Sequence, residues 1–472
     1  MREWLKVTFN ITIPAAANKL ICELIDNGHT AYVVGGCVRD SLLGRTPNDW
    51  DICTSATPEE MLKIFSDYKV IETGLKHGTL TVVVNDQQYE ITTFRIDGEY
   101  SDNRRPDSVT FTIKLEEDLS RRDFTINAMA YNYDEGLVDP FGGLVDIERR
   151  VIRCVGNAEE RFDEDALRVL RTFRFACQLG FSIDFTTSMA AQTKSVLLKN
   201  ISKERINSEL CKMIATDYFP NIMLLYPAVW PQIIPETQYM IGFDQANPYH
   251  DYDVWQHTSA ALRYAASEDI TTKLAIFFHD FGKPHCYQED ADGTRHFKGH
   301  GKVSAQLADE IMLRLRFDNK TRHDVTELVH YHDAAFELGT KYVKRWLSKI
   351  GVEQFKRLLA IRRADIMGQS ILNRDARLRK IKDIEQLLSN VLTSAECFSL
   401  KDLDISGTDL LQLGFKSDKK LGQTLEHLLQ QVIDGELQNN KGELVNAALL
   451  ELWNYNTEVI MRESCGIQAH KT

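Results

Sequence analysis

The chain has 472 residues, of which 43% are hydrophobic and 26% are charged, and its formal net charge is −12 at pH 7. This length exceeds what one hydrophobic core usually supports and the composition is that of a globular protein, so we expect about two to four domains. The acidic balance argues against a protein that binds nucleic acid broadly over its surface.

The first 20 residues alternate polar and apolar side chains and contain no signal-peptide core. No apolar run approaches the roughly 20 residues that span a bilayer. Nine cysteines are scattered without a C-x-x-C pair, which favours reduced thiols over a disulfide framework or a zinc ribbon. The sequence therefore predicts a cytoplasmic protein without a membrane partner.

Short β-rich segments alternate with turn signals through the first part of the chain. We expect strands in AYVVGG (31–36), WDICT (50–54), GTLTVVVN (78–85), YEITTFRI (89–96) and SVTFTIKL (108–115). A helix is expected between them, because Thr57 can cap it, Pro58 suits its first position, and Glu59 and Glu60 suit its first turn. The pattern predicts a mixed α/β unit.

The pair Asp49 and Asp51 is the first candidate for chemistry. On a strand, residues two apart project to one side, so both carboxylates would meet at one point while Trp50 packs on the opposite face. Carboxylates that close repel each other unless a cation lies between them, and magnesium prefers such oxygen ligands. The alternative for an isolated pair of this kind is the polar end of a strand beside a turn.

Neighbouring residues favour a nucleoside triphosphate site around this pair. Gly35 and Gly36 allow backbone amides to approach a phosphate closely, and Arg39 follows within one turn of a predicted helix. Glu90, on a later predicted strand, is a candidate third acidic ligand. Metal ions held here would activate an attacking hydroxyl and neutralise the departing pyrophosphate.

Six motifs follow one another between residues 30 and 215: GGCVRD, DWDI, RRDFTINAMAYN, DPFGGLVDI, RFDEDALRVLRTFRF and ISKERINSEL. Together they resemble the bacterial class II tRNA nucleotidyltransferases, which comprise the CCA-adding enzymes and the closely related poly(A) polymerases. A later stretch, KLAIFFHDFGKP, resembles the HD domain that many of these enzymes carry, and LDISGTDLLQLGF resembles their C-terminal part.

The resemblance implies an α/β nucleotidyltransferase head like that of polymerase beta, with a small mixed sheet, over residues 1–150. All-α parts would follow: a neck with a base-reading motif (151–245), an HD domain (246–370) and a tRNA-binding tail (371–472). The implied activity is template-independent addition of C, C and A from CTP and ATP to the 3′ end of tRNA, with release of pyrophosphate. The oligomeric state is left open.

The resemblance also implies that eight residues bind the incoming nucleotide: Gly36, Arg39, Arg122, Asp123, Asp165, Arg168, Arg171 and Arg174. Gly36 and Arg39 would hold the triphosphate. Arg122 and Asp123 would lie near the ribose and phosphates, with Asn127 supporting the turn. Asp49 and Asp51 would be the catalytic residues and would bind magnesium.

Asp165 and Arg168 would read the base, and their chemistry supports this role. Residues three apart share a helix face, where the acid accepts from an exocyclic amino group and the arginine donates to a ring acceptor. Cytosine and adenine both fit such a pair, whereas uracil and guanine present the reverse pattern. A surface ion pair is the alternative. Arg171 and Arg174 turn away from this face and fit phosphate contact or packing against the sheet domain.

The segment RIDGEYSDNRRPDS (95–108) is polar, contains Gly and Pro and shows no period, as is typical of a functional loop. In the family, a flexible loop at this place helps the site change from CTP to ATP. Its full length here favours complete C-C-A addition over addition of the two cytidines alone.

Residues 250–370 read as helices and contain the spaced histidines and aspartates of an HD domain: His257, His279, Asp280 and Asp365. Such a mixed set suits manganese, nickel or zinc better than magnesium. His300 and His332 are candidate ligands of a second ion, with His330 as the alternative to His332. These groups could instead only hydrogen-bond within a helical body. By resemblance, such domains cleave phosphomonoesters or phosphodiesters.

Residues 341–382 contain 13 lysines or arginines and three acidic residues. A solvated helix face and a track for a polyanion backbone both fit this excess, and we favour the track. Further on, Asp404 or Ser406 is expected to begin a helix near Gly407. The amphipathic tail is expected to be mostly core, and by position it would hold the tRNA elbow.

The leading interpretation is a CCA-adding enzyme with magnesium, CTP, ATP and tRNA as its partners. The alternatives are a poly(A) polymerase and a partial enzyme that adds only C-C or only A. An interpretation of a different class is an HD phosphohydrolase whose head serves only to bind RNA.

Overall fold

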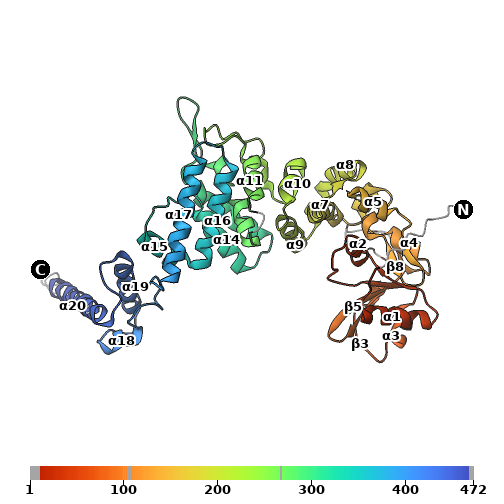
Figure 1. Ribbon diagram of the computed structural model, residues 1–472, viewed down its shortest axis with the longest axis horizontal. Coiled ribbons are helices and arrows are strands. Elements are labelled where there is room, and N and C mark those ends of the chain that lie inside the picture. Colours follow the sequence, from red (N-terminus) through yellow and green to blue (C-terminus); the bar gives the residue numbers. More distant parts are fainter. Residues whose placement is uncertain are drawn as a thin grey trace. The chain divides into compact units, whose positions relative to one another are not determined.

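The computed structural model describes residues 11–98, 100, 103, 106, 108–265 and 268–466. The chain divides into two compact units, which are described separately below (Figure 1). One consists of Met1–Ile241 with Ile311–Asp318, and the other of Gly242–Glu310 with Asn319–Thr472. Part of the predicted CTP-to-ATP loop, residues 99, 101, 102, 104, 105 and 107, lies outside the described residues. No helix among those described is long and apolar enough to cross a membrane.

A seven-stranded sheet forms the centre of the first unit, in the order β3-β4-β5-β2-β1-β8-β9. Its strands are β1 (Ala31–Val34), β2 (Ile52–Thr54), β3 (Lys69–Gly74), β4 (Thr79–Val84), β5 (Gln87–Thr93), β8 (Ala130–Asn132) and β9 (Gly136–Val138). β2 runs parallel to β5 and the other neighbours are antiparallel, so the predicted mixed sheet is confirmed.

Two strand predictions differ from the structure. Segments β6 (Arg95–Asp97) and β7 (Val109–Phe111) pair with each other in a separate ribbon and do not join the large sheet. Strand β3 was not expected, because KVIETG lacks the alternation of apolar and polar residues that marks a half-buried strand. In the structure, each of its residues is exposed or half-buried.

Helices alternate with the strands along the first unit and continue after β9. They are α1 (Ala15–Asp26), α2 (Gly36–Leu42), α3 (Pro58–Ile64), α4 (Leu115–Ser120), α5 (Gly143–Arg149), α6 (Ala158–Glu164), α7 (Leu167–Leu179), α8 (Phe185–Lys194), α9 (Lys203–Ile214) and α10 (Phe219–Leu225). A short parallel pair joins β10 (Val151–Ile152) to β11 (Ser182–Ile183). The predicted start of α3 is confirmed, since Thr57 and Glu60 form a capping box.

The second unit is helical apart from the hairpin β12 (Gln288–Glu289) and β13 (Arg295–His296). Its first helices are α11 (Val254–Arg263), α12 (Ile270–Phe278), α13 (His300–Arg314, whose end belongs to the first unit), α14 (Asn319–Tyr331), α15 (Thr340–Ile350), α16 (Val352–Gly368) and α17 (Arg374–Thr393). A Cβ on Gly368 would lie 2.8 Å from the backbone nitrogen of Ala261, so this glycine permits close packing of α16 on α11.

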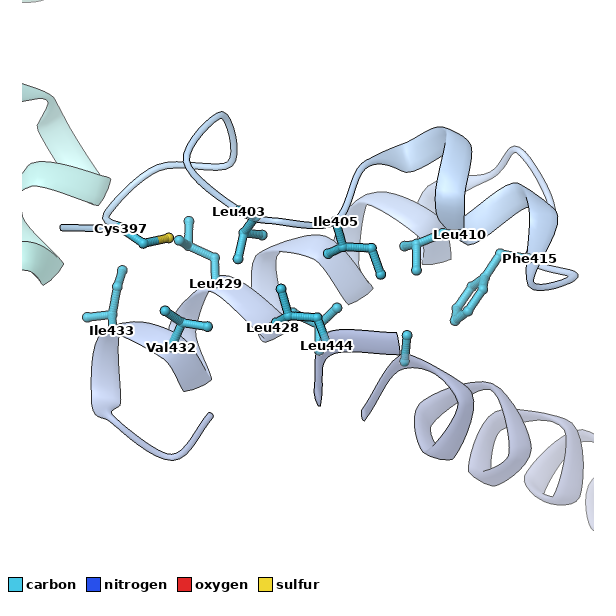
Figure 2. Packing of buried hydrophobic residues seen from close by; sticks show 11 residues of the cluster. Cys397, Leu403, Ile405, Leu410, Phe415, Leu428, Leu429, Val432, Ile433 and Leu444 are labelled. Carbon is cyan, nitrogen blue, oxygen red and sulfur yellow. The ribbon is translucent and has the colours of Figure 1, made fainter. Parts of the chain in front are cut away.

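The C-terminal helices α18 (Gly407–Gln412), α19 (Lys419–Asp434) and α20 (Lys441–Gly466) enclose a core of their own (Figure 2). Leu410, Leu428 and Leu444 are fully buried in it. Ser406 caps the start of α18 through a capping box with Asp409. The helix therefore begins at Ser406 and not at Asp404, the other expected start.

Candidate active site

The turn between β1 and α2 lies against the start of β2. Gly35 has φ +81°, and a Cβ there would lie 3.2 Å from Nη1 of Arg122. The Val34 amide donates to the carbonyl of Asp51 at 2.9 Å, and the Gly35 amide donates to the carbonyl of Met129 at 3.1 Å. These bonds fix the glycine turn beside Asp51, with the first turn of α2 facing the same region.

Asp49 and Asp51 lie in an irregular segment, not on a strand as predicted, because β2 begins only at Ile52. The ladder with β1 ends where Gly35 turns away. Glu90 on β5 lies beside Asp51, since Ile52 pairs with the residue that follows Glu90. Burial and the charge of Glu90 raise the pKa of Asp51 to about 6, with Asp49 adding to the shift. This excess of negative charge fits a divalent cation.

A cavity of about 460 Å³ opens next to Asp51. All eight residues that the sequence predicted to bind nucleotide line it. The complete lining is Gly35, Gly36, Arg39, Asp51, Arg121, Arg122, Asp123, Asn127, Asp165, Leu167, Arg168, Arg171, Arg174, Phe175 and Arg205. With seven arginines against three aspartates, the cavity is suited to a polyphosphate.

A chain of hydrogen bonds connects four residues that line this cavity. Arg39 Nη1 donates to Asn127 Oδ1 at 2.6 Å, Asn127 Nδ2 donates to Asp123 Oδ1 at 3.1 Å, and Arg171 Nε donates to Asp123 Oδ2 at 2.7 Å. Burial alone would raise the pKa of Asp123, but the charge of Arg171 and the bond from Asn127 lower it to about 2. The ionised aspartate therefore holds these side chains in fixed positions.

Phe175 is a buried residue of the cavity that sequence reasoning missed. The guanidinium carbons of Arg39, Arg171 and Arg174 lie 5.0, 5.2 and 3.8 Å from its ring centroid. Cation–π contact with one ring gathers three cations around it. The available signal was an aromatic residue directly after the regularly spaced arginines, at the end of RTFRF. Arg174 also donates through Nε to Glu209 of α9 at 2.5 Å, so it packs against a helix and not against the sheet.

Asp165 and Arg168 do not share the face of one continuous helix, which corrects the geometric prediction. Helix α6 ends at Glu164, Asp165 is extended (φ −129°), and its Oδ1 accepts from the amide of Leu167 where α7 begins. Arg168 pairs with Glu164 at 2.6 Å, whereas Asp165 pairs with Arg205 at 3.3 Å. Both nevertheless line the cavity, and Arg205 is a further residue that the sequence analysis missed.

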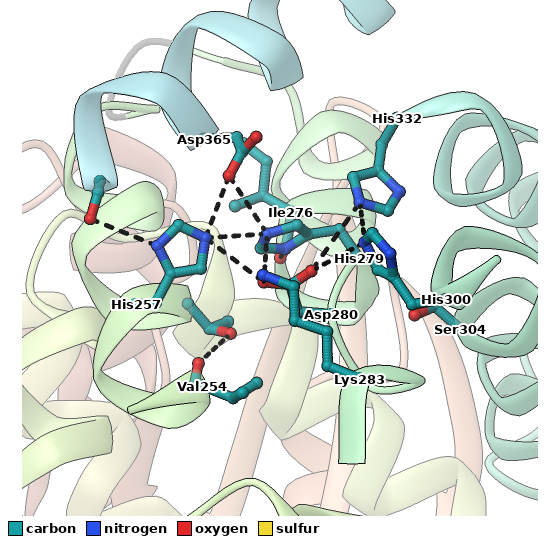
Figure 3. A network of polar contacts seen from close by, with 12 residues as sticks. Val254, His257, Ile276, His279, Asp280, Lys283, His300, Ser304, His332 and Asp365 are labelled. Atoms are coloured by element: carbon teal, nitrogen blue, oxygen red, sulfur yellow. Dashed lines mark hydrogen bonds and ion pairs between the residues drawn. The ribbon is translucent and has the colours of Figure 1, made fainter. Parts of the chain in front are cut away.

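The histidines and aspartates of the second unit converge at one buried place (Figure 3). Ligand atoms of His257, His279 and Asp365 lie within 4.8 Å of one another, as do those of Asp280, His300 and His332. The second group therefore contains His332 and not the alternative, His330. Among the described residues, these two groups are the compact clusters of three or more such side chains.

Each of the four histidines turns Nδ1 toward a backbone carbonyl, and Nε2 faces the centre. The Nδ1-to-oxygen distances are 3.3 Å from His257 to Gly368, 2.6 Å from His279 to Ile276, 2.8 Å from His300 to Phe297 and 2.7 Å from His332 to Val329. A carbonyl at Nδ1 fixes the tautomer that leaves Nε2 to bind a metal. This arrangement fits a metal site better than a hydrogen-bonded helical body.

Two residues near these candidate ligands were not predicted. Lys283 Nζ lies 2.7 Å from Asp280 Oδ2, and Gln369 Nε2 donates to Asp365 Oδ1 at 2.7 Å. Burial alone would raise the pKa of Asp280, but the charges of His279 and Lys283 hold it well below its usual range. Asp280 is therefore a carboxylate, as a metal ligand must be.

In the structure, the positive charges of residues 341–382 are partly neutralised by ion pairs. Acidic residues outside this window pair with several of its cations: Lys341 and Arg345 with Asp434, Lys344 with Glu396, Arg357 with Asp269, and Arg363 with Glu385. These four acidic residues offset part of the excess charge on which the predicted polyanion track depends.

Three families match the chain in separate stretches. The poly A polymerase head domain matches residues 31–153, the RNA and SrmB-binding site of polymerase A matches residues 180–238, and domain 2 of tRNA nucleotidyltransferases matches residues 300–448. The expected polymerase-type head with a mixed sheet, followed by helical parts, is confirmed.

The chain is 52% identical to the CCA-adding enzyme of Lactobacillus johnsonii over 439 residues, which cover 91% of this chain and 95% of that enzyme. The CCA-adding enzyme of Geobacillus thermodenitrificans is 53% identical over 196 residues, which cover 42% of this chain and 48% of that enzyme. Among solved structures, the Bacillus stearothermophilus CCA-adding enzyme in complex with CTP matches with a TM-score of 0.69 at 28% identity, covering 95% of this chain and 100% of that one. Since the similarity to the Lactobacillus johnsonii enzyme extends over nearly the whole length of both chains, the chain belongs to the family of the CCA-adding enzymes.

Proposed function

We propose that the chain is a cytoplasmic CCA-adding tRNA nucleotidyltransferase, which adds C, C and A from CTP and ATP to the 3′ end of tRNA and releases pyrophosphate. One observation carries the proposal: eight predicted nucleotide-binding residues line a single cavity beside Asp51. Relatives that align with this chain over most of their own length are CCA-adding enzymes, which also supports the proposal.

Asp49 and Asp51, with Glu90 nearby, are the residues that would hold magnesium (Mg²⁺). The raised pKa of Asp51 supports this assignment, because desolvation and the negative charges of Glu90 and Asp49 outweigh the nearby positive charge of Arg122. When bound, magnesium neutralises charge on the triphosphate and makes the attacking hydroxyl more acidic. The open carboxylate set suits this ion, which is usually held by one or two carboxylates together with substrate phosphates.

The reaction joins two substrates beside Asp51. The terminal 3′-oxygen of the RNA attacks the α-phosphorus, the bond from that phosphorus to the pyrophosphate oxygen breaks, and the hydroxyl proton passes to water. The arginines of the cavity orient the triphosphate and stabilise its charge, while Asp165 and Arg168 select the base. Positioning and electrostatic stabilisation supply most of the acceleration.

The test is nucleotide incorporation on tRNA that ends at the discriminator base, with CTP and ATP supplied separately and together. We expect two additions with CTP alone and three, ending in A, with both nucleotides. A long ladder of A with ATP alone would identify a poly(A) polymerase, and two additions with both nucleotides would identify a C-C-adding enzyme.

The two ligand groups around Asp280 favour a second function for the other unit, a metal-dependent phosphohydrolase. Manganese, nickel or zinc suits its mixed histidine and carboxylate ligands. The Asp49→Ala/Asp51→Ala variant tests it, because nucleotide addition should be lost while hydrolysis of a phosphomonoester with added metal should survive. Loss of both activities in a folded variant would contradict this proposal.

A further inference from the structure

A second cavity, of about 210 Å³, lies beside Asp51 in the first unit. Its lining residues are Val34, Asp51, Ile52, Thr79, Glu90, Thr92, Arg95, Arg121 and Arg122. Asp51, Arg121 and Arg122 also line the nucleotide cavity, so the two spaces share a wall. The carboxylate that would hold magnesium stands in this wall.

The size of this cavity suits the end of a long molecule. Pockets that enclose a whole small ligand usually measure about 300–1,000 Å³, and this one is smaller. A nucleotidyl transfer needs two reactants at one metal site, and the larger cavity accounts for the triphosphate. The remaining reactant is the terminal nucleotide of an RNA chain, whose reacting hydroxyl must come within about 3–3.5 Å of the phosphorus.

Two threonine hydroxyls line this cavity from neighbouring strands. Thr79 of β4 is opposite Thr92 of β5, and their hydroxyl oxygens are 3.0 Å apart. One hydroxyl donates to the other, which leaves both donor and acceptor capacity for a ligand. The ribose 2′-hydroxyl is likewise donor and acceptor, and it is the group that distinguishes RNA from DNA.

Arginines close the cavity near these hydroxyls. Arg95 Nε donates to Asp97 Oδ1 at 3.0 Å and Arg121 Nη2 donates to Asp118 Oδ1 at 2.7 Å, so both guanidinium groups are held in place. Arg122 also lines the wall, and its Nη2 donates to Asp118 Oδ2 at 3.1 Å, which likewise holds its guanidinium group in place. A phosphate next to the terminal ribose would supply a strong acceptor to such groups.

We propose that the smaller cavity is the acceptor subsite, which binds the 3′-terminal ribose of the RNA with its 2′-hydroxyl at Thr79 and Thr92. The adjoining phosphate lies at Arg95 and Arg122. This inference rests on the function proposed above, because it takes the larger cavity as the nucleotide site. The terminal 3′-oxygen then reaches Asp51 from the side opposite the departing pyrophosphate, as an in-line displacement requires.

The test uses the full-length Thr92→Val variant and a Thr79→Val variant, each close in shape to the natural residue. Addition of C is measured on tRNA without its CCA end and on the same tRNA ending in a 2′-deoxyribose. We expect each substitution to raise KM for the ribose acceptor by about three- to tenfold, the effect of one lost hydrogen bond. KM for CTP and KM for the deoxy acceptor should stay unchanged.

The matched control is Thr110→Val, since Thr110 is exposed on β7 and lines neither cavity. An increase in KM for CTP, or an equal increase for both acceptors, would overturn the subsite assignment. Absence of any C addition by the unmodified protein would instead refute the proposed function, so the two failures are distinguishable.

Discussion

Asp51 is a carboxyl group whose surroundings favour its protonated form. Burial and the neighbouring charge of Glu90 raise its pKa to about 6 in the folded protein, whereas an unperturbed aspartate has a pKa of about 3.9. Because folding raises this pKa, the ionised group lowers the free energy of unfolding, and the loss grows as pH rises from about 4 to about 6. A divalent cation would offset it.

We therefore expect Asp51→Asn to raise the melting temperature at about pH 7.5 in the presence of a chelator and to leave it unchanged near pH 4. The same variant should lose CTP addition by about 100- to 1,000-fold or more, the usual cost of a missing electrostatic group in an active site. Calorimetry across this pH range checks the first part. A lower melting temperature at neutral pH would contradict the pKa argument.

Asp165 is the residue whose change should alter base selection. The Asp165→Asn side chain carries an amide donor where the carboxylate accepted from an amino group, so uracil becomes the better match. We expect the ratio of kcat/KM for CTP to that for UTP to fall by about tenfold or more. Asp163→Asn is the control, because Asp163 pairs with Lys194 and does not line the cavity. An unchanged ratio would remove Asp165 from base reading.

Among the elements, those set by local chemistry could be predicted from the sequence. The start of α3 depends on Thr57 and Glu60, three residues apart, and both act as expected. The end of α6 could not be predicted, because EDALRVLRTFRF keeps helical periodicity through the break. That break depends on distant partners: the amide of Ala166 donates to the carbonyl of Asn103, and Arg205 pairs with Asp165.

Helices α16 and α17 are joined through Gln369, which also contacts one of the proposed metal ligands. Gln369 donates to Asp365, and its Oε1 accepts from Arg377 of α17 at 2.6 Å. We expect Gln369→Leu to weaken manganese binding by about 10- to 100-fold, as loss of an outer hydrogen bond to a metal ligand typically does. Titration calorimetry with manganese measures it. Gln386→Leu, at an exposed position of α17, should bind the metal normally.

For the whole molecule, the sequence predicted a polymerase-type head followed by helical parts correctly, but it could not predict which charges meet. Arg345 and Asp434 are far apart in the chain, yet they form an ion pair at 2.8 Å. A count over residues 341–382 cannot include that aspartate. Cavity residues such as Arg121 and Phe175 were missed for the same reason, since their role arises only where several elements converge.

The division into two units predicts two separable activities. Asp280→Asn should abolish tight manganese binding, because this carboxylate belongs to one ligand group and lies 3.1 Å from a histidine of the other. Its kcat for CTP addition should stay unchanged. Asp290→Asn, at an exposed position near the hairpin, serves as control. A loss of CTP addition in the Asp280 variant would show that the units depend on each other.

The seven arginines around the larger cavity also have a consequence for turnover. Pyrophosphate carries most of the negative charge through which the arginines bind the nucleotide. The same cavity is therefore expected to bind this leaving group tightly. We therefore expect escape of pyrophosphate to limit the rate of each cycle. Inorganic pyrophosphatase cannot reach the product while it is held, and added pyrophosphate should compete directly with CTP.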